Sequence, residues 1–579
     1  MYEADGGGGS TADWLVSTKV LWANALILMV VMFALLPIID NGYIALPDEG
    51  LYSAQAQNLA NGSWRSDRPA PDIDDTGQLD SLAPSKTFDT TDIPYANHPL
   101  YPLALTLPYK ALGKSGQLAV SVISVWASAV FSALLARRFD RRYGLPALWL
   151  TALGTPLVFS AYVVMAHSLA AAAAAALVLT VTLAVEDHRF SMIPLTLVST
   201  AALVLVRSEG ILVAAAVGGV VGLMALPWRG RKLDLASGSI AAAVLVTGAG
   251  TFLIEQIFVS TLVGTDGRAS VVEAAVDRAG PASAAWISLL KPWDSGLEAK
   301  VQVLLILVCT VLGALTLRIR PTFSLLPLAL WALAAAAGVL TALTGPSLIS
   351  GLVPAFPLLV VPVLFTTRTD LGNPLFQRLA GVTVLVTIAI VFTTYADGGA
   401  TQWGGRFYHV LIPLAVPLVL LGVTHALGKL EPSHARFAGA CLVIVAVSIS
   451  ISALQANRSY RNRSRSVVTE TIAVARDWDD GRQIVLFGRN QGDGLSRTFW
   501  EQRDSYEILH SGGLGGVMPL IAQISTTDIN RVVLISDIDA MQITTLGEDV
   551  LPRAGWEVTD TPPRGDSGLY VLDVRPVEG

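Results

Sequence analysis

Two adjacent carboxylates, Asp48 and Glu49, have the clearest potential for chemistry in this sequence. They directly follow Pro47, after the first apolar run, and Asn61-Gly62 closes the segment. A proline at the start, acids in the first turn and Asn-Gly as a stop predict a short helix lying on a membrane surface. Acids in a first turn also complement the helix dipole, which would explain an isolated pair. At the edge of a hydrocarbon layer, however, a carboxylate is costly unless it is paired, hydrated or used.

A histidine lies further along the same connecting segment. The residues Asn97-His98-Pro99-Leu100-Tyr101 open a second short apolar stretch that ends near Leu112. The segment therefore carries acids at one end and a histidine at the other. This combination favours function over helix capping for Asp48 and Glu49.

A third motif, Gln402-Trp403-Gly404-Gly405-Arg406-Phe407-Tyr408, precedes a proline-rich apolar run. Tryptophan, tyrosine and arginine also gather at membrane interfaces without any catalytic role. Taken alone, the motif fits an interfacial belt equally well. Together with the acidic pair and the histidine, it favours a functional role for Trp403 and Arg406.

Other ionisable residues interrupt apolar runs. Arg207 and Glu209 can simply neutralise each other, although an arginine at such a boundary can also hold a lipid phosphate. His167 is at a similar turn, where an interfacial histidine is commoner than a ligand, and Glu255 is a candidate cavity residue. No spacing typical of a metal site is present, so no metal ligand is predicted, and a divalent cation is left as an open alternative.

Membrane helices must position these residues. The 579-residue chain is 53% hydrophobic and 15% charged, whereas a soluble domain carries about 25% charged residues. Its net charge of −6 gives no support for nucleic-acid binding. Many of its apolar runs reach the roughly 20 residues that cross a bilayer as helix. About thirteen spans are predicted, near residues 20–39, 117–136, 145–164, 168–185, 191–206, 210–227, 236–258, 299–318, 322–343, 352–366, 379–396, 409–427 and 436–456.

The basic connectors set the predicted orientation. Arg137–Arg142, Arg368–Arg378 and similar connectors fall on alternate turns, and short basic loops stay in the cytoplasm. The loop 40–116 and everything after Ala456 then lie outside, although the basic stretch Arg458–Arg465 argues for the opposite. Heavy use of Ala, Val and Leu with few Lys suggests a GC-rich bacterial genome. We therefore expect a multi-pass protein of a bacterial plasma membrane.

The composition changes after the last apolar run. Strand-like runs alternate with helix-like stretches there, which predicts a small soluble α/β domain. The predicted strands are Ile484–Phe487, Val532–Ile535 and Leu569–Val574, and the predicted helices are Ser466–Asp477 and Gly516–Ile524. The run Gly512–Gly516 lacks the context of a dinucleotide fingerprint and is predicted to be a loop.

Three domains follow from these patterns. Residues 1–19 are expected to form a disordered cytoplasmic N-terminus, residues 20–456 a transmembrane catalytic domain, and residues 457–579 the extracytoplasmic α/β domain. The fold class is therefore an all-α polytopic membrane protein with a small C-terminal α/β domain.

The three motifs resemble the GT-C superfamily of membrane glycosyltransferases, which take a sugar from a polyprenyl-phosphate carrier. Pro47-Asp48-Glu49-Gly50-x-Tyr52 looks like the acidic motif that follows the first transmembrane helix in that superfamily. His98-Pro99-Leu100-Tyr101 looks like an element that often reads Lys-Pro-Pro in lipid-A aminoarabinose transferases and protein O-mannosyltransferases, with histidine where lysine is common. Trp403-Gly404-Gly405-Arg406-Phe407 resembles a Trp-Gly-x-Arg-(Phe/Tyr) segment of actinobacterial GT-C proteins.

The resemblance implies transfer of a sugar to an acceptor hydroxyl, with inversion. Asp48 would be the base, and Glu49 would assist acceptor binding or fix Asp48. Cationic groups would hold the donor phosphate, namely His98, Arg207 and Arg406. Further substrate contacts would come from Tyr52, Tyr101, His167, Glu209 and Trp403.

The resemblance leaves both substrates open. The acceptor would be a cell-wall polysaccharide, a glycolipid or a protein. The donor sugar could be arabinose, mannose, glucose, galactose or aminoarabinose, and the GC-rich composition slightly favours arabinosyl or mannosyl transfer in cell-wall assembly.

Other classes of membrane protein fit the sequence less well. A transporter or a flippase for lipid-linked sugars commonly has related halves and binding groups near the midplane. Here the ionisable residues collect at the outer boundary, and no internal repeat is evident. A polysaccharide polymerase or ligase would concentrate basic residues in one large late outside loop, instead of acids in the first.

Overall fold

The computed structural model contains the whole chain, and a defined set of segments is described here. These are residues 17–67, 85–88, 91–94, 98–227, 233–263, 283, 285–291, 297–321, 325–345, 348–393, 403–476, 481–487, 499, 507–510, 524, 528–536, 551–553, 555–560 and 570–577.

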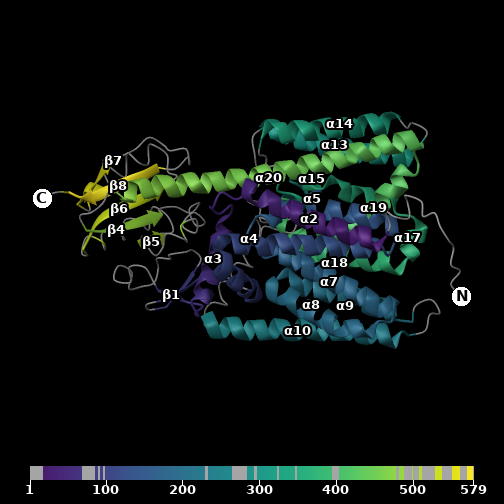
Figure 1. Cartoon of the computed structure of the whole chain (residues 1–579), viewed down its shortest axis with the longest axis horizontal. Coiled ribbons are helices and arrows are strands. Elements are labelled where there is room, and N and C mark those ends of the chain that lie inside the picture. The colour runs from purple at the N-terminus through teal and green to yellow at the C-terminus, as the bar shows by residue number, and fades with distance from the viewer. Residues whose placement is uncertain are drawn as a thin grey trace.

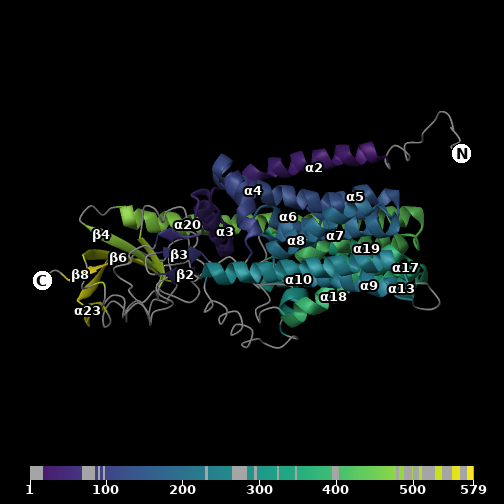
Figure 2. The same cartoon turned by 90° about the horizontal axis from the view of Figure 1, so that it is seen from below.

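Long helices form one bundle, shown in Figure 1 and, after a quarter turn, in Figure 2. Among the described residues, nine helices are long and apolar enough to cross a membrane. They are α2 (Thr18–Ile39), α4 (Leu100–Ala136), α7 (His167–Glu186), α10 (Leu235–Val263), α13 (Leu297–Ile319), α14 (Leu325–Thr344), α18 (Pro374–Thr393), α19 (Ile412–Leu427) and α20 (Pro432–Arg476). The predicted polytopic helical class is confirmed.

The other four predicted spans are shorter or broken helices. Prolines that cannot continue a helix accompany two of the breaks, at Pro156 and Pro357. The elements are α5 (Gly144–Leu153) with α6 (Leu157–Ala161), η2 (Phe190–Met192) with α8 (Ile193–Val206), α9 (Glu209–Ala225), and α15 (Leu352–Ala355) with η4 (Pro357–Leu359) and α16 (Val360–Phe365). Short connecting elements are η1 (Arg141–Tyr143), η3 (Trp286–Leu290), α17 (Arg368–Gly372) and η5 (Arg406–Leu411).

Helix α7 lies at the centre of the packing. It is the most buried of the nine long helices, and it contacts α4 and α8 extensively. Its run Ala170–Ala176 presents small side chains, which let neighbouring backbones approach closely. The low-complexity alanine run therefore forms part of the core.

The segment between α2 and α4 contains the short helix predicted there. Helix α3 spans Pro47–Ala60 and is followed by Asn61, as expected from the sequence. Three short strands follow, β1 (Ser66–Asp67), β2 (Ser85–Phe88) and β3 (Thr91–Pro94), in the antiparallel order β1-β3-β2. The second apolar stretch and the next span form one helix, α4, which kinks at Gly113 with φ of 60°.

A five-stranded sheet forms the C-terminal part, with the order β5-β4-β6-β8-β7. The three predicted strands are confirmed as β4 (Arg482–Phe487), β6 (Ile529–Ser536) and β8 (Tyr570–Pro576). Two more strands, β5 (Glu507–His510) and β7 (Trp556–Asp560), lie at the edges, and α23 (Leu551–Arg553) precedes β7. Strand β4 is parallel to β5 and β6, whereas β8 is antiparallel to β6 and β7.

Helix α20 connects the bundle to this sheet without a break. It runs through the predicted domain boundary after residue 456 and includes most of the predicted helix Ser466–Asp477. Its residues Val467, Val468 and Ala475 pack against Val485 and other residues of the sheet. The predicted loop Gly512–Gly516 and nearly all of the predicted helix Gly516–Ile524 lie outside the described residues, as do residues 1–16.

The start of α2 and the C-terminal sheet lie at opposite ends of the bundle (Figures 1 and 2). An odd number of crossings produces this arrangement. Helix α3 and both sheets gather at one end, which is also where the residues with candidate chemistry meet.

Candidate functional site

An ion pair joins the acidic motif to the Trp-Gly-Gly-Arg motif. The Nη1 of Arg406 donates to Oδ2 of Asp48 at 3.1 Å, although the two residues are 358 positions apart in the chain. The side chain of Asp48 is 35% exposed and that of Arg406 is 19% exposed. Asp48 occupies the first turn of α3 behind Pro47, where a proline needs no hydrogen-bond partner for its nitrogen. The pair is therefore formed within the protein and still accessible from solvent.

Two glycines direct Arg406 toward Asp48. Gly404 and Gly405 have φ of 65° and 61°, the left-handed region that favours glycine. A Cβ on Gly405 would lie 2.3 Å from the carbonyl oxygen of Ser288, and one on Gly404 would lie 2.6 Å from Cβ of Pro156. The backbone passes through a gap that only glycines fit, and η5 begins immediately afterwards with Arg406.

A second arginine lies close to the same place. Arg207 forms a bidentate ion pair with Glu209, in which Nε and Nη2 each donate at 2.8 Å. Its Nη1 is 3.4 Å from Nε2 of His167. The guanidinium of Arg207 also lies 5.9 Å from the centroid of the Phe407 ring. The predicted neutralisation of Arg207 by Glu209 therefore occurs beside the Asp48–Arg406 pair.

Tyr52 lies among these charged groups, one turn after Asp48 on α3. Its ring meets that of Tyr101 edge-on, with 5.0 Å between the centroids. Burial raises the pKa of the Tyr52 phenol above its ordinary value, and the charges of Arg207, Asp48, Glu209 and Arg406 also act on it. The phenol therefore stays protonated and can donate a hydrogen bond at neutral pH.

His98 is paired with a carboxylate on another helix. Its Nδ1 is 2.6 Å from Oε1 of Glu255, and Glu255 is almost fully buried. The contact joins the start of α4 to the C-terminal half of α10. His98 therefore contributes a hydrogen-bonded imidazole at the edge of the site.

Two of the predicted aromatic contacts are fully buried. Trp403 stacks on Phe159 with 6.2 Å between the ring centroids, and Tyr101 places its hydroxyl 3.3 Å from Oγ of Ser121. These positions suit packing beneath the site. Tyr52 and Phe407 are the aromatic side chains that lie against its charged groups.

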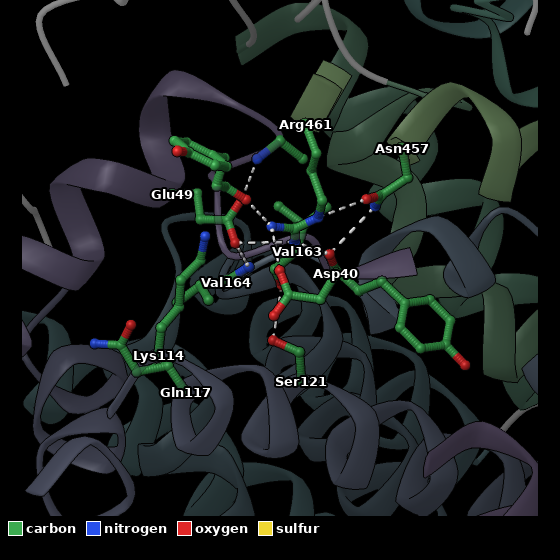
Figure 3. Close-up of polar contacts among 12 residues, drawn as sticks. Asp40, Glu49, Lys114, Gln117, Ser121, Val163, Val164, Asn457 and Arg461 are labelled. Carbon is green, nitrogen blue, oxygen red and sulfur yellow. Dashed lines mark hydrogen bonds and ion pairs between the residues drawn. The ribbon is translucent and has the colours of Figure 1, made fainter. Parts of the chain in front are cut away.

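Glu49 lies next to Arg461 and the backbone of Val164, as Figure 3 shows. It is fully buried, and its Oε2 accepts a hydrogen bond from the backbone nitrogen of Ala45 at 2.6 Å. Its Oε1 accepts from the backbone nitrogen of Val164 at 3.3 Å and from Nη2 of Arg461 at 3.2 Å. Of the two expected roles for Glu49, this geometry favours fixing Asp48 over contacting an acceptor.

Sequence reasoning missed Arg461. It belongs to a run of four arginines at positions 458, 461, 463 and 465 that bears on membrane orientation, and nothing local distinguishes it from the other three. In the structure Arg461 is buried, whereas Arg458, Arg463 and Arg465 are exposed. Residues three apart are neighbours on a helix surface, so the spacing of Arg458 and Arg461 on α20 does not predict that one is exposed and the other buried. That difference depends on contacts with distant parts of the chain.

The charged groups of the site are arranged in pairs. Within the described segments, no three His, Cys, Asp or Glu side chains lie close enough together to hold a metal ion. The site thus presents one accessible carboxylate, a protonated phenol and two arginines that face one aromatic ring. Such a set can take a proton from a hydroxyl and hold an anion beside it.

Comparison with solved structures identifies the fold. The crystal structure of apo ArnT from Cupriavidus metallidurans aligns with a TM-score of 0.50 and 11% identity, covering 98% of each chain. The apo oligosaccharyltransferase of Archaeoglobus fulgidus aligns with a TM-score of 0.50 and 12% identity, covering 93% of this chain and 72% of that one. Both are GT-C proteins, so the chain has the GT-C fold. No family model and no curated protein sequence matches it.

Proposed function

Because the chain has the GT-C fold, we propose that it is a glycosyltransferase that moves a sugar from a polyprenyl-phosphate donor to an acceptor hydroxyl. The observation that carries the proposal is the partly exposed Asp48 carboxylate 3.1 Å from Arg406, with Arg207 close by. Transfer of a sugar from a lipid phosphate requires a base for the proton of the acceptor hydroxyl and cations for the charge of the departing phosphate. The sequence motifs that resemble GT-C transferases occur at these same residues.

In the proposed mechanism, Asp48 accepts the proton of the acceptor hydroxyl as the acceptor oxygen attacks the anomeric carbon. The bond between that carbon and the phosphate oxygen breaks on the opposite face, so the configuration inverts. The bonding electrons leave with the lipid phosphate, which regains the full negative charge on that oxygen. Arg406 and Arg207 stabilise this charge, because cationic donors act strongly where water is scarce.

The resting ion pair supports these roles. Arg406 favours the ionised form of Asp48, as an opposite charge nearby does for any carboxyl. The Nε of Arg406 is buried and has no hydrogen-bond partner among the described residues, so it is a donor that an arriving phosphate oxygen can use. Phosphate binding would then draw Arg406 from Asp48 as the carboxylate takes up the proton.

We place the reaction on the extracytoplasmic side of a bacterial plasma membrane. The basic connector after α4 lies beside the start of α2, where Arg137 donates to Thr18 at 3.3 Å. The start of α2 is at the end of the bundle opposite to α3 (Figures 1 and 2), which fits the positive-inside rule. Residues 457–579 would then form an outside domain beside the site, close enough to contact an acceptor. That acceptor would be a cell-wall polysaccharide, a glycolipid or a protein, and the sugar a pentose or a hexose.

Sugar transfer by the purified protein tests the proposal. In liposomes, the protein should transfer label from one of a panel of polyprenyl-phosphate pentoses and hexoses to added acceptors. Asp48→Asn should abolish turnover while Glu431→Gln, an exposed carboxyl remote from the site, should leave it intact. Movement of the intact labelled lipid between leaflets without transfer would identify a flippase instead, and transfer by Asp48→Asn at the wild-type rate would remove Asp48 as the base.

A further inference from the structure

We propose that Arg461 is a positioning residue of the transferase site, which holds Glu49 and through it the first turn of α3, so that Asp48 faces Arg406. This inference rests on the proposed function. It makes the part of α20 that leaves the membrane bundle a component of the site.

Arg461 is fully buried and contacts groups from four parts of the chain (Figure 3). Its Nη2 donates to Oε1 of Glu49 and its Nη1 to Oδ1 of Asp40, each at 3.2 Å. The same two nitrogens also donate to the backbone carbonyls of Tyr43 and Tyr162. Its Nε donates to Oδ1 of Asn457 at 3.1 Å. One guanidinium thus ties the end of α2, the start of α3, the end of α6 and α20 together.

The charge balance makes this guanidinium hard to replace. Two carboxylates, Asp40 and Glu49, share Arg461, and they are 13% and 0% exposed. Removing the guanidinium would leave the buried Glu49 and the largely buried Asp40 without their cation, which is strongly unfavourable. A lysine would keep the charge but has a single nitrogen, so it cannot reach all of these acceptors at once.

Glu49 transmits the position of Arg461 to Asp48. The two acids are neighbours in the first turn of α3, and Glu49 also binds the backbone of Ala45 and of Val164. A displaced Glu49 therefore moves the backbone that carries Asp48. A second contact between the same segments, from Nδ2 of Asn41 to Oδ1 of Asn462 at 2.9 Å, holds the loop against α20.

The experiment compares Arg461→Lys, Arg461→Met and Glu49→Gln in the full-length protein. The control is Arg458→Met, an exposed arginine on the same helix. We expect kcat to fall on the order of 10²-fold in the Arg461 variants, the cost of misplacing a catalytic group by about 1 Å. The donor KM should change only a few-fold. Arg461→Met combined with Glu49→Gln should lose no more kcat than the worse single variant, because both act through one element.

Two measurements distinguish a positioning role of Arg461 from a general loss of folded structure. The acid limb of the kcat–pH profile should move to higher pH in Arg461→Lys, since Asp48 loses part of the field of Arg406, and in Arg458→Met it should not move. Hydrogen exchange in the first turn of α3 should also become faster in Arg461→Lys than in the control. If Arg461→Met does not fold, Glu49→Gln still tests the link, because it keeps Arg461 paired with Asp40.

The outcomes distinguish the two proposals. If the wild-type protein transfers no sugar, the proposed function fails. The role of Arg461 is then tested by hydrogen exchange alone, and unchanged exchange of the α3 amides in Arg461→Lys would overturn it. If the wild-type protein is active and folded Arg461→Lys and Glu49→Gln keep kcat within about twofold and an unshifted acid limb, the positioning role is overturned and the proposed function stands.

Discussion

Arg207 and Arg406 face the same aromatic ring, that of Phe407, with their guanidinium carbons 5.9 Å and 4.9 Å from its centroid. Two like charges would normally repel each other so close together. Here each has its own carboxylate, Glu209 for Arg207 and Asp48 for Arg406, and the ring accepts part of both charges. An arriving anion can therefore meet two cationic groups whose positions are already fixed.

The Arg406–Asp48 pair predicts a coupled loss of rate and shift of pH profile. Arg406→Gln should lower kcat by about 10²–10³-fold, the usual effect of removing one charge-stabilising donor. It should also move the acid limb of the profile to higher pH, because Asp48 loses the cation that favours its ionised form. Sugar transfer from pH 4 to 8 measures both effects. The control is Arg465→Gln, which replaces an exposed arginine and should behave like wild type. An acid limb that stays in place in Arg406→Gln would show that Arg406 does not act on the ionisation of Asp48.

The backbone of Gly405 predicts a sharp sensitivity to one methyl group. Gly405→Ala should abolish transfer and lower the thermal stability, because the Cβ meets the Ser288 carbonyl at 2.3 Å and the left-handed backbone costs about 1–2 kcal/mol more for alanine. The matched control is Gly219→Ala in α9, where a Cβ meets nothing within 4 Å. Thermal unfolding and turnover are measured for both. If Gly405→Ala loses no more turnover or thermal stability than Gly219→Ala, the backbone before η5 can take another path and still bring Arg406 to Asp48.

The C-terminal sheet predicts a pH-dependent stability. Burial tends to raise the pKa of Asp573, but hydrogen bonds from Arg531 at 2.8 Å and Arg575 at 2.7 Å outweigh it and hold that pKa below its usual range. The stabilisation is therefore present above the unfolded-state pKa of about 3.9 and is lost as pH falls through the folded-state pKa. Hydrogen exchange of the amides in β6 and β8 should show a lower unfolding free energy for Asp573→Asn than for wild type, and this difference should narrow below about pH 4.

The control for that experiment is Asp528→Asn. Asp528 also pairs with an arginine, Arg482, but it is 76% exposed, and exposed pairs contribute little. Its unfolding free energy should follow that of wild type at every pH. A deficit for Asp573→Asn that is the same at pH 3 and pH 7 would contradict the role assigned to the ionised carboxylate.

The membrane orientation predicts which positions can be labelled from outside. Ser63→Cys and Val577→Cys, both exposed at the α3 end of the bundle, should react with an impermeant maleimide on intact cells, and the exposed His188→Cys at the other end should not. The natural Cys309 and Cys441 are buried, so the background should be low. Labelling of His188→Cys alone would place the site in the cytoplasm.

Features encoded by neighbouring residues could be predicted from the sequence. The bounds of α3 follow from Pro47 and Asn61, and three strands of the C-terminal sheet follow from β-branched runs. The polytopic class follows from composition. These signals act over a few residues, so a single sequence contains them.

Features that depend on distant contacts could not be predicted in the same way. Glu49 and Asp48 are adjacent and chemically similar, yet only the packing against α20 decides that one is buried and the other accessible. Trp403 appears interfacial by residue type, and its burial depends on Phe159 from another helix.

The continuity of α20 has a mechanical consequence. Its 45 residues, at about 1.5 Å each, are about twice as long as a hydrocarbon core of about 30 Å requires. The distal half is therefore a stiff rod, anchored in the bundle at one end and carrying the sheet at the other. Torque applied to the sheet would therefore pass along this rod to the helical turn that contains Asn457 and Arg461.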